Sequence, residues 1–116
     1  MIWKRIAAIA WTLLIIVLCS VPGGSLPEVR LFSADKLAHF GVFAILSWLW
    51  MISMTSTFHE RSRRVIVLGL ALAGLTEVYQ GLFVVGREPE VLDLLANAAG
   101  LLAGVWAFRV YVSRKA

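Results

Sequence analysis

Four long apolar runs separated by short polar segments constrain the fold more than any other feature of the sequence. They cover about residues 3–21, 37–58, 65–85 and 92–112. A helix needs about 20 residues to cross the hydrocarbon core of a bilayer, and these runs approach or exceed that length. Backbone groups in lipid must be paired within their own segment, so the runs predict helices and not strands. We therefore expect an all-α fold, an integral membrane four-helix bundle forming one domain over residues 1–116.

The composition supports a membrane protein and argues against a nucleic-acid-binding protein. Hydrophobic residues make up 60% of the chain and charged residues 16%, whereas soluble domains contain about 25% charged residues. The net charge of +4 comes from short basic clusters between the apolar runs, which is typical of membrane orientation signals. The only cysteine, Cys19, supports neither a disulfide nor a cysteine metal site.

The distribution of basic residues predicts which side of the membrane each connection faces. With the N-terminus in the cytoplasm, the cytoplasmic segments hold eight of the eleven Lys and Arg residues. The positive-inside rule therefore favours cytoplasmic N- and C-termini, with residues 22–34 and 84–90 outside and a basic loop near residues 57–64 inside. The first run also has features of a signal peptide, but it has no evident small-x-small cleavage motif, so we expect it to be retained.

Polar residues from three of the predicted helices fall at one depth, near the outer membrane boundary. The set comprises Asp35, Lys36, His39, Glu77, Gln80, Arg87, Asp93 and Asn97. Ionisable groups inside a membrane are costly unless they are paired or hydrated, so their convergence indicates a functional site. Glu77 is the strongest member, because a carboxylate among apolar neighbours costs about 2–3 kcal/mol unless it has a partner or water.

The start of the fourth run combines polar residues and glycines on one face. Asp93, Asn97, Gly100 and Gly104 form a single stripe on a helix of about 3.6 residues per turn. The glycines would let a neighbouring helix approach closely, while Asp93 and Asn97 would point into the space between the helices. This face is therefore expected to contact other helices and not lipid.

The residue types suggest roles within this site. The candidate catalytic residues are His39, Glu77 and Asp93, and the candidate substrate-binding residues are Asp35, Lys36, Gln80, Arg87 and Asn97. The positively charged side chains of Lys36 and Arg87 would hold a phosphate or carboxylate. The candidate cofactor is a divalent cation bound by the carboxylate oxygens of Glu77 and Asp93. The imidazole of His39 is a less typical ligand for a hard metal. Structural roles remain alternatives for each residue, including helix capping, interhelical hydrogen bonding and snorkelling.

The tryptophans are spread over the apolar runs and give no sign of a cofactor site. They are Trp3, Trp11, Trp48, Trp50 and Trp106. Such aromatic residues are typical of the membrane interface. We therefore expect them to face lipid or headgroups.

Three short blocks of this sequence resemble the VanZ-like family of small bacterial membrane proteins. They are Asp35-Lys36-Leu37-Ala38-His39-Phe40, Glu77-Val78-Tyr79-Gln80 followed by Gly86-Arg87, and Asp93-Leu94-Leu95-Ala96-Asn97-Ala98-Ala99-Gly100. The resemblance implies the bacterial cytoplasmic membrane, the cell envelope and an association with glycopeptide (teicoplanin) resistance. It implies no particular reaction.

Three classes of function are compatible with these observations. The favoured one is a membrane protein with an outward-facing polar site that binds or acts on an envelope lipid headgroup, such as that of a lipid-linked cell-wall intermediate. The alternatives are a small transporter or ion pathway, and a non-catalytic assembly protein held together by its polar groups and glycines. The sequence leaves open whether the protein is an enzyme.

Overall fold

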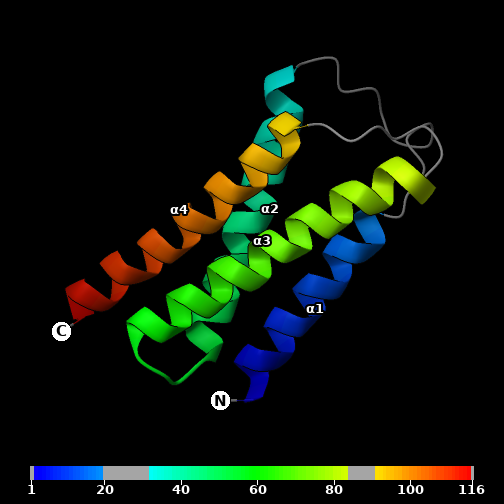
Figure 1. Ribbon diagram of the computed structural model, residues 1–116. Helices are drawn as coiled ribbons and strands as arrows, with labels where there is room; N and C mark the ends of the chain where they lie inside the picture. Colours follow the sequence, from blue (N-terminus) through cyan, green and yellow to red (C-terminus); the bar gives the residue numbers. More distant parts are fainter. Residues whose placement is uncertain (1, 20–31, 84–90, 116) are drawn as a thin grey trace.

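The computed structural model describes residues 2–19, 32–83 and 91–115, and within them the chain forms four helices and no strand (Figure 1). The helices are α1 (Ile2–Cys19), α2 (Phe32–Ser53), α3 (Phe58–Phe83) and α4 (Val91–Lys115). The predicted all-α fold is therefore confirmed. Consecutive helices run in opposite directions, so α2 and α4 run in one direction and α1 and α3 in the other (Figure 1).

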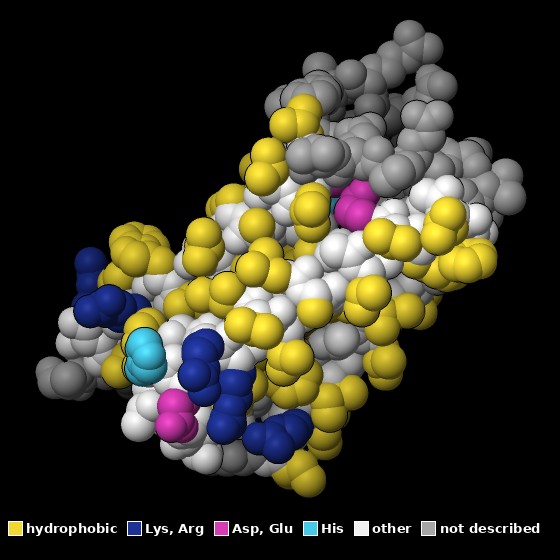
Figure 2. Space-filling model, viewed as in Figure 1, with side chains coloured by type: hydrophobic (Ala, Val, Ile, Leu, Met, Phe, Trp, Pro, Cys, Tyr) yellow, Lys and Arg dark blue, Asp and Glu magenta, His cyan; other side chains and the backbone are white. Residues whose placement is uncertain are grey.

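Two of these helices are long and apolar enough to cross a membrane, judged by length and composition. They are Phe58–Phe83, with a mean hydropathy of 1.6, and Leu92–Arg114, with a mean hydropathy of 1.4. The apolar part of α2, Leu37–Ser53, is shorter. Hydrophobic side chains also cover much of the outer surface of the helices (Figure 2). An apolar surface of this extent is unusual for a soluble monomer and suits contact with lipid.

The connection between α2 and α3 is shorter than the sequence suggested. The predicted second helix ended near residue 58 and was followed by a basic loop at residues 57–64, but α2 ends at Ser53 and α3 begins at Phe58. The hydroxyl of Thr57 accepts a hydrogen bond from the Glu60 backbone N–H at 3.3 Å, and the Thr57 carbonyl accepts one from the Arg61 N–H at 2.9 Å. Thr57 and Glu60 have the spacing of a capping box, which starts a helix at this point. The arginines that were predicted in a loop, Arg61, Arg63 and Arg64, therefore lie in the first turns of α3.

Helices α2 and α4 approach so closely that two positions of α4 have no room for a side chain. A Cβ atom on Gly100 would collide with the carbonyl oxygen of Phe40. A Cβ atom on Gly104 would collide with the carbonyl oxygen of Ala44 and with the hydroxyl of Ser47. The obstacles include backbone atoms, which cannot rotate away. The glycines therefore allow the two backbones to come into contact, as the stripe on the fourth run predicted.

Helix α1 is joined to α2 by two tryptophan side chains. The Trp11 indole N–H donates to the carbonyl of Val42 at 3.0 Å, and the Trp50 indole N–H donates to the Thr12 hydroxyl at 3.0 Å. The expectation that these two tryptophans face lipid or headgroups is therefore met only in part, because both side chains are half-buried and each indole N–H has its acceptor within the α1–α2 contact. Two other tryptophans are largely exposed, as predicted: Trp3 and Trp106.

The described basic side chains gather at one end of the molecule, where the chain termini and the α2–α3 connection also lie (Figures 1 and 2). Among the described side chains, the Lys and Arg residues are Lys4, Arg5, Arg61, Arg63, Arg64, Arg109 and Arg114. The Arg61 guanidinium donates to the carbonyls of Met51, at 3.2 Å, and Ser56. It thereby satisfies backbone acceptors at and beyond the C-terminal end of α2. This end is called the basic end below.

Candidate functional site

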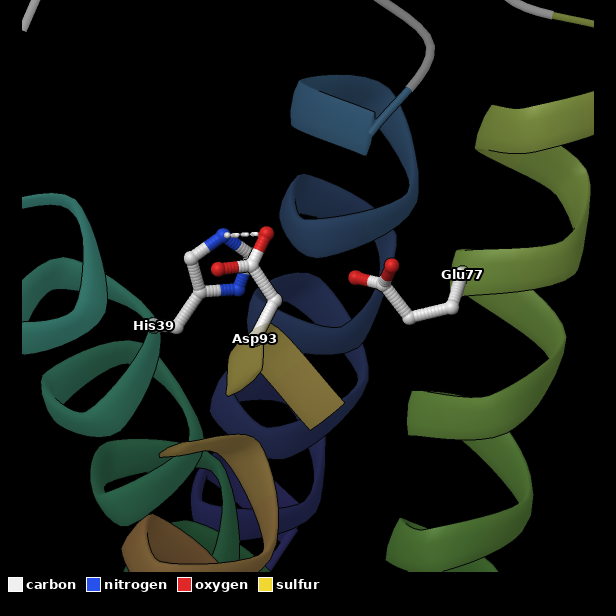
Figure 3. A group of neighbouring side chains, drawn as sticks. All are labelled: His39, Glu77 and Asp93. Atoms are coloured by element: carbon white, nitrogen blue, oxygen red, sulfur yellow. Dashed lines mark ion pairs between the residues drawn. The ribbon is translucent and has the colours of Figure 1, made fainter. Parts of the chain in front are cut away.

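Three helices bring His39, Glu77 and Asp93 together (Figure 3). They lie towards the helix ends that are opposite the basic end (Figure 1). His39 comes from α2, Glu77 from α3 and Asp93 from α4. Figure 3 shows the carboxylate of Glu77 reaching from α3 towards the other two side chains. One potential ligand atom from each residue lies within 4.8 Å of the other two.

The helix directions explain why residues so far apart in sequence meet at one level. His39 lies near the start of α2 and Asp93 near the start of α4, and these two helices run in the same direction. Glu77 lies near the end of α3, which runs in the opposite direction. The start of α2, the end of α3 and the start of α4 therefore share one end of the molecule.

The orientation of the His39 imidazole is set by α4. Its Nδ1 lies 2.9 Å from Oδ1 of Asn97, and its Nε2 lies 3.6 Å from Oδ2 of Asp93. A carboxamide oxygen can only accept a hydrogen bond, so Nδ1–H is the donor and Nε2 is left facing Asp93. Asn97 and Asp93 are four residues apart, on one face of α4, and together they contact both ring nitrogens.

The described side chains of the site are largely buried. Glu77 is 6% exposed, Asp93 8% and Asn97 1%. The His39 side chain is 19% exposed, and in Figure 2 acidic side-chain atoms are visible in a recess between apolar helical surfaces. The carboxylate oxygens of Glu77 and Asp93 can accept hydrogen bonds from hydroxyl groups or ligate a cation.

The structure brings together four of the eight residues predicted for the site: His39, Glu77, Asp93 and Asn97. The side chains of the other four predicted residues are not described. Asp35 and Lys36 lie in α2 and Gln80 lies in α3, but the structure describes only their backbone. Arg87 lies outside the described residues. Their predicted substrate-binding roles stay predictions.

Asn97 makes an interhelical contact, one of the structural alternatives that the sequence left open. It is deeply buried with its side-chain oxygen on the imidazole of His39, and its predicted substrate-binding role stays a prediction. The spacing of four residues from Asp93 was the available signal, because it puts both side chains on the face that meets α2. The partner on α2 depended on how the two helices pack.

Comparison with known proteins identifies the family. A family model described as VanZ/LLP1 matches residues 1–112, which include all eight predicted site residues. No curated protein and no solved structure matches the chain. The matched region covers nearly the whole sequence, and it contains Phe58–Phe83 and most of Leu92–Arg114, the two described helices that are apolar enough to span a bilayer. The chain is therefore a membrane protein that belongs to the VanZ/LLP1 family.

Proposed function

We propose that this protein spans the bacterial cytoplasmic membrane several times and binds the headgroup of an envelope lipid at a site that opens to the outer side. The observation that carries the proposal is the convergence of His39, Glu77 and Asp93 from three helices, towards the end opposite the basic end. Burying two carboxylates and an imidazole in an apolar protein is costly, and a functional site gives a reason to retain them. Headgroup binding would link the protein to glycopeptide resistance, the association implied by the family resemblance.

The basic end supports the orientation in this proposal. Lys and Arg are retained on the cytoplasmic side of membrane proteins, and the described basic side chains lie near the two termini and in the first turns of α3. This orientation places both termini in the cytoplasm. The carboxylates and the imidazole would then face the outer leaflet, where lipid-linked cell-wall intermediates are exposed.

Labelling of single cysteines tests the orientation. In a chain that carries Cys19→Ala, we expect Thr55→Cys, an exposed position in the α2–α3 connection, to react with a membrane-impermeant maleimide only after the cells are permeabilised. The matched variant is Glu88→Cys, in the predicted outer connection, and it should react in intact cells. Labelling of Thr55→Cys in intact cells would refute the proposed orientation.

The residue types fit a headgroup that carries sugar hydroxyls and phosphate. Carboxylates such as those of Glu77 and Asp93 accept hydrogen bonds from hydroxyl groups. The imidazole of His39 is suited to proton exchange with a bound group. Lys36 and Arg87 are predicted to supply the positive charge for phosphate. These features favour a lipid-linked sugar phosphate over a zwitterionic bulk lipid.

The packing between the site and the basic end favours headgroup binding over an ion pathway. A cluster of buried apolar side chains lies in the interior of the helices, comprising Ile15, Phe43, Leu46, Ala73 and Leu101. A second cluster follows towards the basic end, comprising Met51, Val65, Val105 and Phe108. A hydrated path for ions would have to cross both clusters, whereas a headgroup site requires polarity only near one membrane face.

Lipid binding by purified protein tests the proposed function. We expect the full chain in nanodiscs to bind a polyprenyl-diphosphate sugar more tightly than phosphatidylglycerol, and His39→Gln and Glu77→Gln to weaken that binding at least tenfold. His59→Gln and Glu60→Gln are the matched controls, because they make the same changes at exposed positions of the basic end. Folded site variants that bind the probe as tightly as the controls would show that the cluster only holds the helices together.

A further inference from the structure

We propose that His39, Glu77 and Asp93 bind a divalent transition-metal ion, with Zn²⁺ as the best-fitting representative. The three side chains offer one imidazole nitrogen and one oxygen from each carboxylate, and these atoms lie within 4.8 Å of one another. They come from three helices, so metal binding would join α2, α3 and α4 at one point. A protein site with three such ligands leaves a further coordination position for water or a substrate oxygen.

The distance between His39 and Asp93 fits two ligands of one ion better than a direct hydrogen bond. Nε2 of His39 and Oδ2 of Asp93 are 3.6 Å apart. A charge-assisted N–H···O hydrogen bond is about 2.7–2.9 Å long. Two ligand atoms about 2.1 Å from a tetrahedral ion are about 3.4 Å from each other. The observed spacing therefore accommodates an ion between these two atoms, and a rotation of the flexible Glu77 side chain would bring its carboxylate, now within 4.8 Å, onto the same ion.

The contact with Asn97 prepares His39 to act as a ligand. Asn97 Oδ1 accepts the Nδ1–H of His39 at 2.9 Å. With the proton of the neutral imidazole on Nδ1, the lone pair is on Nε2, the nitrogen that faces Asp93. Histidines that ligate metals usually donate their other ring N–H to an oxygen in this way, which fixes the tautomer and the ring orientation. Asn97 is therefore a positioning residue for this site.

The donor set and its charge select the class of metal. Mg²⁺ and Ca²⁺ prefer sites built from oxygen alone, whereas an imidazole beside carboxylates suits Zn²⁺, Mn²⁺ or Fe²⁺. Two carboxylates also match the charge of a divalent cation, which lowers the cost of placing all three side chains in apolar surroundings. Among ions of this class, Zn²⁺ binds more tightly than Mn²⁺ in most nitrogen and oxygen sites.

A metal would also change how the site meets an anionic lipid headgroup. Two carboxylates alone repel phosphate, but a bound divalent cation with an open coordination position attracts a phosphate oxygen. This role of the metal rests on the proposed function, whereas metal binding itself does not. The two can be measured separately, because metal binding requires no lipid and lipid binding can be followed with and without a chelator.

Direct metal binding by the untagged full chain in detergent tests the assignment. After chelator treatment and dialysis, we expect one Zn²⁺ per chain by titration calorimetry, with weaker binding of Mn²⁺ and much weaker binding of Mg²⁺. His39→Gln, Glu77→Gln and Asp93→Asn should each weaken Zn²⁺ binding at least 100-fold. His59→Gln and Glu60→Gln, at the basic end, should leave it unchanged.

Spectroscopy of the unaltered chain keeps the test decisive if a site variant does not fold. The X-ray absorption spectrum of the Zn²⁺-loaded protein should show one imidazole nitrogen among oxygen ligands. Absence of Zn²⁺ binding, binding that survives substitution of all three residues, or a zinc shell without imidazole would each overturn the assignment. A chain that binds Zn²⁺ but not the lipid probe would retain this assignment and refute the proposed function.

Discussion

Gly100→Ala and Gly104→Ala are each expected to destabilise the protein by about 1–3 kcal/mol, the usual cost of overpacking a tight contact. The added methyl group would meet the Phe40 carbonyl oxygen at Gly100, and the Ala44 carbonyl oxygen and Ser47 hydroxyl at Gly104. Alanine improves helix propensity by about 1 kcal/mol over glycine, so packing and propensity act in opposite directions. We expect packing to dominate, because carbonyl oxygens within a helix cannot move without displacing the whole helix.

Thermal unfolding in detergent, followed by circular dichroism, measures this effect. Gly74→Ala is the matched control, since a Cβ atom at that helical position would meet nothing within 4 Å. The control should unfold at the same temperature as the unaltered chain or at a slightly higher one. If Gly100→Ala and Gly74→Ala had equal stability, α2 and α4 could not be packed as closely as the structure shows.

Asn97→Ala is expected to weaken Zn²⁺ binding by about 10–100-fold, the usual effect of removing a partner that orients a metal ligand. The substitution removes the oxygen that accepts the Nδ1–H of His39 at 2.9 Å. The imidazole would then be free to rotate or to move its proton to Nε2, the nitrogen needed for the metal. Asn97 is not one of the three proposed ligands. A loss of Zn²⁺ affinity in this variant would therefore measure how well His39 is oriented, not the loss of a ligand.

The conservative variant Asn97→Asp separates positioning from a general loss of structure. It keeps an oxygen that can accept the Nδ1–H, so it should bind Zn²⁺ within about tenfold of the unaltered chain. The absorption spectrum of Co²⁺ bound at the same site gives a second measurement, because its bands report coordination geometry. Equal Zn²⁺ affinity in Asn97→Ala and the unaltered chain would show that Asn97 does not orient His39.

Helix type was predicted correctly from the sequence, whereas some helix boundaries were misplaced. The apolar runs required helices, because lipid offers no partners for backbone groups. The start of α3 at Phe58 was misplaced because charge was taken as a sign of a loop. The capping spacing of Thr57 and Glu60 was a local signal that pointed to the correct start. Charged residues in a first turn are compatible with a helix when that turn lies beyond the apolar core.

The tryptophans show a limit of reasoning from residue type. Tryptophans in apolar runs are typical of the membrane interface. Trp11 and Trp50 nevertheless each donate a hydrogen bond across the α1–α2 contact. The residue type shows that each side chain has an apolar ring and one hydrogen-bond donor, the indole N–H. It does not tell which neighbouring helix presents the acceptor, so the sequence could not separate the half-buried tryptophans from the exposed ones.

The sequence by itself determined that the chain is helical and apolar, that its polar residues lie near the helix ends, and that one face of α4 carries Asp93, Asn97 and two glycines. These properties follow from composition and from the helical repeat, which are local. Only the tertiary structure decided that the Nδ1 of His39 meets Asn97 and that its Nε2 stands 3.6 Å from Asp93, with Glu77 beside them. Such contacts depend on the rotation and close approach of separate helices, which are set by packing at positions such as Gly100 and Gly104.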